Sequence, residues 1–298
     1  IPLWVLFYYA YFIGKLLRNR IEGSLDFKRS LKIRLDMKLK KIAALLGAFT
    51  IASSLFIAGC GSDTTRNDKV WRVGTDATYA PFGFKDKDSG KLDGFDIDII
   101  NAVAKEEGIE ADIQNLNFDA LLPALQSNTI DIAISDMTIS EDRAKSVDFS
   151  NPYYIAGNGL VVNIDNTTIH SFKDLEGKRI GVSIGSTGAE IASKIPNADV
   201  RQFNIIVDAF LELENKGVDV VINDTPVNEY YVNGKGKGIA KVTGEDYDAA
   251  PLGIAVKKGN TELLKNINDG LAKIKANGKY AEIYKKWFGK EPPVEDLK

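Results

Sequence analysis

From Val70 onward, short β-like runs alternate with helix-like stretches, and this alternation restricts the possible folds more than any other feature. One helix is expected over 95–108, because Phe95, Ile99 and Val103 share a helical stripe and Gly108 can end it. The other expected helical stretches are 208–217, 225–234, 261–276 and 279–288. The expected strands are 71–75, 131–135, 178–183, 199–203, 218–223 and 251–256. Such alternation is typical of α/β architecture.

Two extended segments, 153–162 and 247–256, are apolar, contain glycine and have no helical pattern. We interpret them as crossings between two lobes. Two crossings predict a discontinuous first lobe, 70–154 and 252–290, with the second lobe, 158–248, inserted into it. Ligands of open α/β sheets lie outside the carboxyl ends of the strands, so we expect a site in the cleft between the lobes.

The segment before Cys60 has the order of a secretory signal, in which basic residues precede an apolar run and then small residues. The residues IAGC, which end at Cys60, resemble a lipobox. In a lipobox the chain is cut before the cysteine, and the cysteine receives a diacyl lipid. We therefore expect a lipoprotein signal peptide over 37–59 and membrane attachment through a lipid on Cys60, since two acyl chains anchor stably. Residues 60–69 are expected to be a polar tether. We interpret 1–36 as an upstream extension from a start assigned too early, with a membrane-associated segment as the alternative.

The charges divide unevenly along the chain. Residues 1–59 hold ten Lys/Arg and three Asp/Glu, which leaves 28 basic and 38 acidic residues from Cys60 onward. The expected mature chain therefore has a net charge of −10, which argues against a nucleic-acid partner. With one Cys and one His in the chain, only carboxylates remain as metal ligands, and we expect no metal and no cofactor.

Several stretches resemble, in sequence and order, the extracellular solute-binding proteins of polar amino acid ABC transporters (bacterial solute-binding protein family 3), and glutamine-binding proteins most of all. The resemblance implies a periplasmic-binding-protein-like fold of two α/β lobes joined by two extended hinge strands. It also implies capture of a free L-amino acid outside the cytoplasm by a monomer, and delivery to a permease with a cytoplasmic ATPase. The stretches that carry it are VGTDATYAPFGF, GFDIDIINAVA, FDALLPALQSNTIDIAISDMTISEDRAKSVDFSNPYY, DLEGKRIGVSIGSTG, NDTP and GKYAEIYKKWFG.

Arg143 stands where a cation is unfavourable. If Ser140 caps a helix, Arg143 is the third helical residue, close to the positive end of the helix dipole. A guanidinium binds a carboxylate in bidentate fashion, and the resemblance assigns this arginine to the carboxylate of the ligand. The structural alternative is a solvated arginine paired with neighbouring acids. Thr138 adds a hydroxyl to the site or is an ordinary turn residue.

The second lobe is expected to supply two groups. Thr187 and Glu190 fit a capping box, so a helix starting there presents free amides to an anion. A phosphate loop is the rival interpretation, but its lysine is absent. Asp224 follows a strand and could simply cap a helix. Because Pro226 favours the first helical position, Thr225 is the expected cap, and Asp224 is free for the ligand ammonium, the role that the resemblance implies.

The first lobe is expected to hold the ligand side chain. The resemblance implies that Asp76 contacts this side chain, that Tyr79 stacks on it and that Phe118 forms another aromatic wall. Taken singly, the two aromatic residues could equally belong to the core. Phe82, near Tyr79, and Ser135, at a strand end, complete the expected ligand-binding set on this side.

Three positions depart from the glutamine-binding pattern. Ser183 stands in place of a lysine, Asn223 in place of a histidine, and Asp136 in place of a small residue. Loss of a cation and gain of an acid could shift the preference to a basic amino acid. Alternatively, Asp136 points to solvent or pairs with Lys145.

Three functions compete. The favoured one is a lipid-anchored binding component of an ABC importer for a polar amino acid, glutamine first, which closes two lobes on the ligand. The same role with arginine, lysine or histidine is the first alternative. The second is an enzyme resembling cyclohexadienyl (arogenate/prephenate) dehydratases, which needs a buried general acid. Acids are present, but His170 is expected on a surface loop, and we expect no enzyme.

Overall fold

In the computed structural model, residues 69–293 are described. The expectations for the extension 1–36, the signal peptide 37–59, the lipid on Cys60 and the tether up to residue 68 lie outside the described residues and stay predictions. Between residues 69 and 293, no helix combines the length and the apolar character that crossing a membrane requires.

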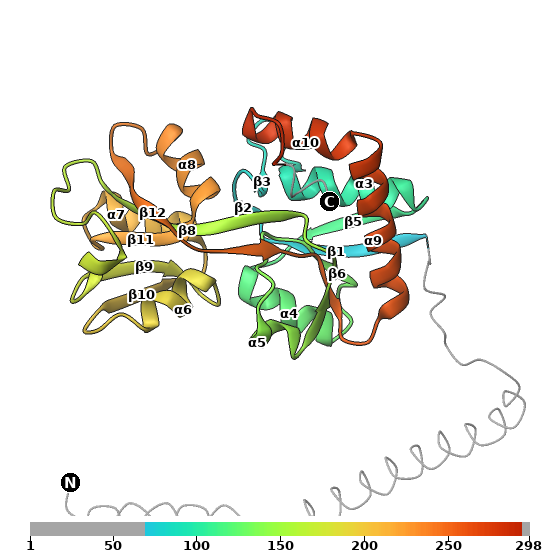
Figure 1. The fold of residues 1–298 in the computed structure, drawn as a ribbon, viewed down its shortest axis with the longest axis horizontal. Coiled ribbons are helices and arrows are strands. Elements are labelled where there is room, and N and C mark those ends of the chain that lie inside the picture. Colours follow the sequence, from blue (N-terminus) through green and yellow to red (C-terminus); the bar gives the residue numbers. More distant parts are fainter. Residues whose placement is uncertain (1–68, 294–298) are drawn as a thin grey trace, which may run out of the picture. The chain divides into compact units, whose positions relative to one another are not determined.

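Lobe 1, as the name is used here, contains a five-stranded sheet, five helices and a small three-stranded sheet. Its elements are β1 (Val70–Thr75), β2 (Thr78–Tyr79), β3 (Gly83–Lys85), β4 (Leu92–Asp93), β5 (Glu110–Asn115), β6 (Ile132–Ala133), β7 (Val147–Phe149), β13 (Ala255–Lys257), α3 (Phe95–Glu106), α4 (Phe118–Gln126), α5 (Glu141–Ala144), α9 (Thr261–Ala276) and α10 (Lys279–Phe288). The large sheet has the order β5-β1-β6-β13-β7, with β5 and β6 parallel to β1. One face is covered by α4, and α3, α9 and α10 pack on the other (Figure 1).

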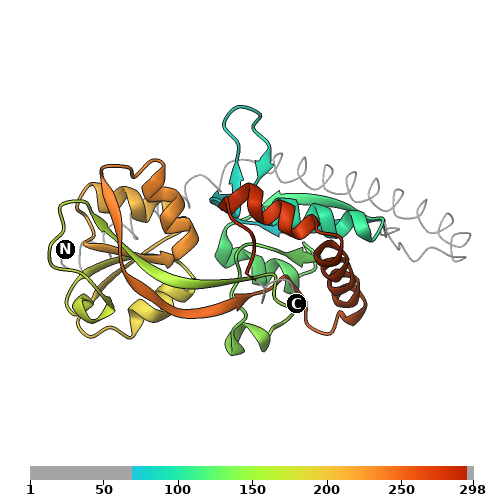
Figure 2. The same cartoon turned by 45° about the horizontal axis from the view of Figure 1, so that its top comes forward.

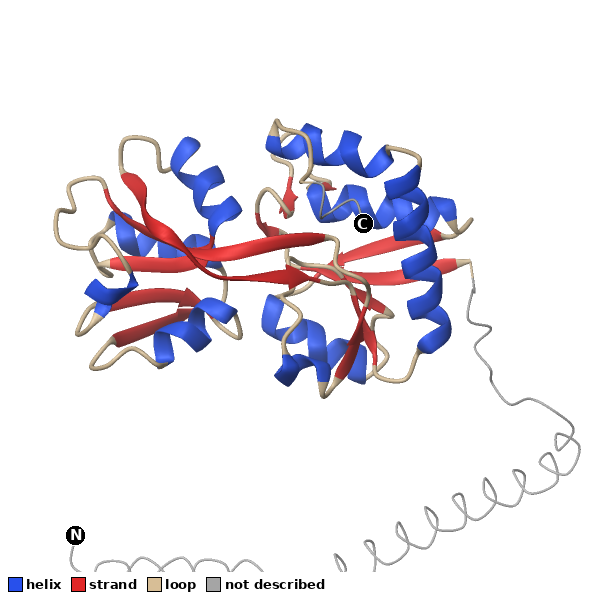
Figure 3. Cartoon of the chain, in the orientation of Figure 1, coloured by secondary structure: helices blue, strands red, loops and turns tan. Residues whose placement is uncertain are grey.

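Lobe 2 repeats this plan with three α-helices. Its elements are β8 (Tyr154–Asn163), β9 (Arg179–Ser183), β10 (Asp199–Phe203), β11 (Val220–Asp224), β12 (Ala240–Leu252), α6 (Thr187–Ser193), α7 (Ile206–Glu214), α8 (Thr225–Asn233) and a 3-10 turn (Phe172–Leu175). The strand order is β10-β9-β11-β8-β12, with β10 and β11 parallel to β9. Figure 3 shows helices on both sides of this sheet as well. The α/β class and the two-lobed fold expected from the sequence are confirmed.

Two strands connect the lobes. Antiparallel to each other, β8 and β12 extend together from the second sheet to lobe 1 (Figures 1 and 2). The expected strand 251–256 is divided in two, since β12 ends at Leu252 and β13 begins at Ala255. Gly253 lies at the break, where its N–H donates to Met137 O at 3.0 Å and a Cβ would lie 2.8 Å from the Ile139 side chain. The lobe boundaries 70–154, 252–290 and 158–248 are kept as a proposal.

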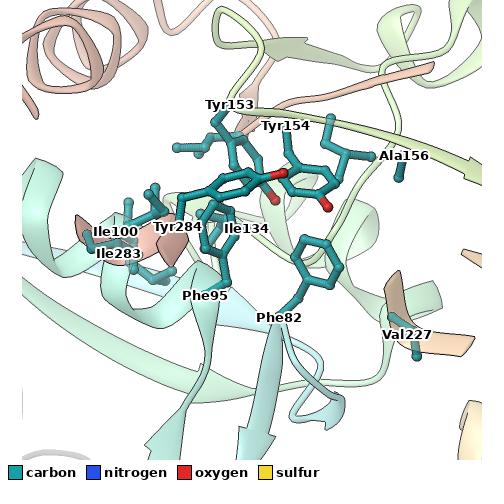
Figure 4. Close-up of a cluster of buried hydrophobic side chains, with 14 of the residues drawn as sticks. Phe82, Phe95, Ile100, Ile134, Tyr153, Tyr154, Ala156, Val227, Ile283 and Tyr284 are labelled. Carbon is teal, nitrogen blue, oxygen red and sulfur yellow. The ribbon is translucent and has the colours of Figure 1, made fainter. Parts of the chain in front are cut away.

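The hydrophobic core of lobe 1 continues to the start of β8. The predicted stripe of α3 is buried, as Phe95, Ile99 and Val103 are all inaccessible to solvent. Phe95 packs against Tyr153 and Tyr154, so α3 contacts the residues where the chain leaves lobe 1 (Figure 4). The helix ends at Glu106, two residues before the predicted stop at Gly108.

Candidate functional site

A pocket lies between the lobes, where the segments that follow β1, β6, β9 and β11 meet. The space between its lining atoms, open solvent included, is about 340 Å³. Ten of the eleven residues predicted to bind a ligand line it, and Ser186, which was not predicted, joins them. The lining residues are Asp76, Tyr79, Phe118, Ser135, Asp136, Thr138, Arg143, Ser183, Ser186, Thr187 and Asp224.

Arg143 brings a buried guanidinium to the pocket. Ser140 caps the four-residue helix α5 by accepting from Arg143 N–H, as expected, and Arg143 is only 7% exposed. Its Nη1 donates to Thr138 O and its Nη2 to Gly185 O of lobe 2, both at 2.9 Å. The guanidinium also lies over the Phe118 ring, 5.2 Å from the centroid. The alternative of a solvated surface arginine is therefore wrong.

Lobe 2 contributes hydroxyl groups from the loop between β9 and α6. The predicted capping box at Thr187 is wrong, because Ser186 is the cap and accepts from Ala189 N–H at 3.1 Å. Thr187 is then the first helical residue, and its Oγ1 lies 3.3 Å from Asn158 Nδ2. The serine before the predicted cap was the available signal for this shift. Ser183 ends β9 and is buried.

Asp224 places a carboxylate at the junction of β11 and α8. It occupies the N-cap position that was expected for Thr225, but its side chain makes no capping bond. Instead, Asp224 Oδ2 lies 2.5 Å from the Tyr79 hydroxyl of lobe 1, as does Asn223 Oδ1. The prediction that the Asp224 carboxylate is not used as a cap is confirmed, and its place in the helix shifts by one residue.

Asp76 is held by its own lobe. Its Oδ1 accepts from the Thr78 N–H at 3.0 Å and from the Thr78 hydroxyl at 2.7 Å, and its Oδ2 accepts from Phe118 N–H at 3.1 Å. The Ser135 hydroxyl accepts from the backbone N–H of Asp76 at 3.0 Å. Asp76 therefore reaches the pocket with a fixed orientation and with both oxygens bonded.

Asp136 differs from Asp76 in having no such partners. It is 3% exposed, and neither carboxylate oxygen accepts a hydrogen bond from the protein. Its backbone is left-handed, with φ at 49°, and its N–H donates to Asp96 Oδ2 at 2.8 Å. Both alternatives for Asp136 are wrong, because it does not point to solvent and because Lys145 pairs with Asp142.

Phe82 is the one predicted residue that the structure removes from the site. Its side chain is fully buried, and its ring packs edge-on against Phe95 and Tyr154, with centroids 5.8 and 5.3 Å away. Figure 4 shows it in the aromatic cluster at the start of β8. Phe82 was expected at the site because it lies close to Tyr79 in the sequence. In the structure Phe82 packs into the core, while Tyr79 faces the pocket.

The electrostatics of the pocket are unbalanced. Burial raises the pKa of Asp76 and of Asp224, although Thr78 opposes the first shift and Tyr79 the second. Burial, together with the nearby carboxyls of Asp224 and Asp96, raises the pKa of Asp136 well above its usual range. Burial also lowers the pKa of the Arg143 guanidinium. One buried cation thus faces three buried acids.

The single histidine lies outside this pocket. His170 is exposed, as expected, and its Nε2 is 3.1 Å from Thr167 O. Within residues 69–293, no three His, Cys, Asp or Glu side chains are grouped so that they could hold a metal ion.

Comparison with known proteins gives a consistent family. The pattern of the bacterial extracellular solute-binding proteins, family 3, matches residues 71–290. A probable histidine-binding protein of Neisseria gonorrhoeae is 37% identical, over 86% of this chain and 98% of its own. The glutamine-binding protein GlnH of an ABC transporter of Bacillus subtilis is 36% identical, over 86% of this chain and 100% of its own.

Two solved structures have the same fold. An ancestral arginine-binding protein bound to arginine matches with a TM-score of 0.72 and 46% identity, over 74% of this chain and 99% of its own. The ancestral amino acid-binding protein AncCDT-1, described as a precursor of cyclohexadienyl dehydratase, matches with a TM-score of 0.69 and 40% identity, over 74% of this chain and 96% of its own.

Proposed function

The chain belongs to the bacterial extracellular solute-binding proteins of family 3, and from that membership we propose that it is the substrate-binding component of an ABC importer for a free amino acid. Relatives named for histidine and glutamine binding support the choice of amino acids as the ligand class. The protein acts outside the cytoplasm and delivers its ligand to a membrane permease that works with a cytoplasmic ATPase.

The main chain of the ligand is bound by charges of opposite sign. Arg143 binds the α-carboxylate, since a buried guanidinium forms charge-assisted bidentate hydrogen bonds with carboxylates. Asp224 binds the α-ammonium from the other lobe. Both side chains line the same pocket, and a zwitterion needs one partner of each sign.

Asp136 favours a cationic amino acid, such as arginine, lysine or histidine, over the glutamine that was favoured from the sequence. A neutral zwitterion is balanced by Arg143 and Asp224 alone, which leaves the buried Asp136 with another carboxyl, that of Asp224, as its neighbour. An uncompensated buried carboxylate is costly, and a second positive charge on the ligand offsets that cost. The buried Asp136, whose oxygens accept no hydrogen bond from the protein, is the observation that carries this choice.

Glutamine is the second candidate. The raised pKa of Asp136 allows its carboxyl to keep a proton, and a neutral buried carboxyl needs no positive charge on the ligand. A glutamine complex would then need Asp136 neutral, whereas an arginine complex needs it charged.

Binding is coupled to closure of the lobes. Arg143 of lobe 1 bonds Gly185 of lobe 2, and Tyr79 of lobe 1 bonds Asp224 of lobe 2, so the described arrangement is a closed one. A ligand that contacts both lobes favours the closed state by its additional contacts there. In this mechanism the ligand meets lobe 1 first, through Arg143, Thr138 and Asp76.

The proposal also covers how the protein is attached to the membrane and whether it catalyses a reaction. A lipid on Cys60 holds the protein, as a monomer, at the outer side of the membrane near its permease. An enzyme of the cyclohexadienyl dehydratase kind is the competing function, supported by the similarity to AncCDT-1. We propose binding without chemistry, because Asp224 and Arg143 together meet the needs of an amino acid main chain.

A thermal-unfolding screen with every common L-amino acid and cystine tests the proposal. A ligand at 100 times its Kd stabilises the folded state by about 2.7 kcal/mol, which is a clear rise in melting temperature. We expect the largest rise with arginine, lysine or histidine. A rise with glutamine alone supports the second candidate. No rise with any amino acid contradicts the binding function, and turnover of arogenate or prephenate would then favour the enzyme.

A further inference from the structure

Asp96 lies behind the pocket and does not touch it. It is the second residue of α3, a place where acids usually favour the helix dipole in solvent. Here the side chain is fully buried, and its Oδ2 accepts the backbone N–H of Asp136 at 2.8 Å. The acid of one element therefore fixes the backbone of another, 40 residues later in the chain.

This hydrogen bond acts at a strained point. Asp136 has a left-handed backbone, which costs a residue with a Cβ more than it costs glycine, although aspartate tolerates it better than most residues. The direction of its side chain follows from that backbone, and the side chain lines the pocket beside Asp224. Without an acceptor at Asp96, the buried N–H of Asp136 has lost its partner, and the backbone has less reason to keep this conformation.

We propose that Asp96 is a positioning residue, which holds the Asp136 carboxylate against the positive side chain of the ligand and so sets the preference for cationic amino acids. The inference rests on the proposed function and deepens it. Asp96 acts only through Asp136, so its loss affects ligands that use Asp136 and spares those that do not.

The carboxyl of Asp96 also acts electrostatically on that of Asp136, whose pKa it raises. Burial raises the pKa of Asp96 to about 7, with the Tyr153 hydroxyl and the Asp136 N–H acting in the opposite direction. The ring of Phe95, the residue before Asp96, stacks on the ring of Tyr153 (Figure 4).

Asp136 is faced by more groups. The carboxyls of Asp224 and Asp96 raise its pKa, and the Arg143 guanidinium lowers it. It also faces the hydroxyls of Tyr79, Tyr153 and Tyr154, whose pKa values it raises. Removal of the charge at Asp96 therefore makes Asp136 easier to ionise.

Calorimetric titration of the full chain with L-arginine and with L-glutamine, from pH 6 to pH 8.5, tests the inference. In Asp96→Ala we expect arginine affinity to fall by about tenfold, because a buried N–H is left unpaired, and glutamine affinity to change by less than about threefold. Asp96→Asn keeps an acceptor oxygen, so its arginine affinity at pH 8 should stay within about threefold of wild type.

The pH dependence of arginine affinity distinguishes a role of Asp96 in positioning Asp136 from a role in packing alone. Wild-type arginine affinity should fall as the pH is lowered and Asp136 takes up a proton. In Asp96→Asn this fall should move to lower pH, because Asp136 no longer feels a second carboxylate. Asp98→Ala is the matched control, since Asp98 lies in the same turn but bonds Lys286 and Trp287 away from the pocket, and its affinities should equal wild type.

The outcomes are distinguishable. Equal losses for arginine and glutamine in Asp96→Ala, or an Asp96→Asn profile that superimposes on wild type, overturn the positioning role while amino acid binding stands. If Asp96→Ala does not fold, the Asp96→Asn profile decides alone. Wild-type protein that binds glutamine at least as tightly as arginine refutes the role in specificity, and wild-type protein that binds neither ligand, nor any other amino acid, refutes the proposed function as well.

Discussion

In each lobe, an arginine near the amino end of a parallel strand bonds the aspartate that directly precedes the neighbouring strand. In lobe 1, Arg72 donates from Nε and Nη2 to Asp131, at 3.1 and 2.7 Å. In lobe 2, Arg179 donates from the same two atoms to Asp219, at 3.1 and 2.5 Å. In both pairs the backbone N–H of the arginine also donates to the aspartate. The amino ends of the central strands are therefore built alike.

The carboxyl ends of the same strands differ. In lobe 2, β11 runs directly into α8, and Asp224 lies at the junction. In lobe 1, β6 is followed by a loop and the short helix α5, which together bring Asp136 and Arg143 to the pocket. The amino ends of the strands, which are alike in the two lobes, therefore stabilise the fold. The segments after the carboxyl ends differ, and they decide which charged groups of a ligand each lobe can bind.

Removal of the pocket arginine should have the largest effect. Arg143→Ala is expected to weaken binding of every amino acid by about 100-fold or more, because a bidentate, charge-assisted contact to the carboxylate is lost. Calorimetry measures the affinity, and circular dichroism checks that the fold is intact.

Arg72→Ala is the matched control, since Arg72 belongs to the scaffold end of the same lobe. It should lower the melting temperature and leave the affinity unchanged. A protein with Arg143→Ala that binds as tightly as wild type would show that the pocket is not the ligand site.

Asp224→Asn should have the next largest effect. The asparagine can still accept from the Tyr79 hydroxyl, so the closed arrangement is preserved, but the charge opposite the α-ammonium is gone. We expect affinity for all amino acids to fall by about 30-fold, within the range for a lost charged hydrogen bond. Asp219→Asn, at the scaffold end of β11, should leave affinity as it is, and an equal loss in both variants would refute the division of roles.

The ligand-free protein should lose stability as the pH rises from about 4 to 7. Folded Asp96 keeps its proton up to a pKa of about 7, whereas the unfolded chain releases it near 3.8. The folded state therefore binds more protons in that window, and each such proton lowers the free energy of unfolding by about 1.4 kcal/mol per pH unit. Denaturant titrations at several pH values measure this slope.

Asp219 of lobe 2 should affect the pH dependence of stability in the opposite direction to Asp96, and over a more acidic pH range. Arg179 holds its pKa below the usual value, so its contribution is present above pH 3.8 and disappears only as the pH falls further. Asp96→Asn should flatten the slope between pH 4 and 7 and leave the acid limb in place. An unchanged slope in Asp96→Asn would contradict the assignment.

Asp136→Gly should give the smallest effect, a gain in stability without ligand. Glycine adopts the left-handed backbone without strain, and the substitution removes a buried carboxyl whose oxygens accept no hydrogen bond, so we expect about 1 kcal/mol more stability at pH 7. Asp248→Gly is the control, because Asp248 also has a positive φ but is exposed, and it should gain only a few tenths of that amount. A loss of stability in Asp136→Gly would mean that the carboxyl has a partner in solution.

The features that the sequence could predict were local ones. Periodic apolar residues predicted α3, and the unfavourable place of Arg143 at a helix start pointed to a special role. Asp224 was recognisable from its position between a strand and Pro226. In each case the signal lies within a few residues of the side chain concerned.

The features that the sequence could not predict depend on distant partners. Whether Phe82 or Tyr79 faces the pocket is decided by packing against Tyr154, more than 70 residues later. The left-handed backbone of Asp136 is held by Asp96, which reads as an ordinary helix-start acid in the sequence. The shift of a cap from Thr187 to Ser186 reflects a choice between adjacent hydroxyls that both suit the position.

A crystal structure of the protein with L-arginine tests the central claim most directly. The account predicts the ligand carboxylate on the Arg143 guanidinium, the α-ammonium on Asp224, and the guanidinium of the ligand within hydrogen-bond distance of Asp136 or Asp76. A ligand bound outside this pocket, or one whose carboxylate does not contact Arg143, would contradict the account.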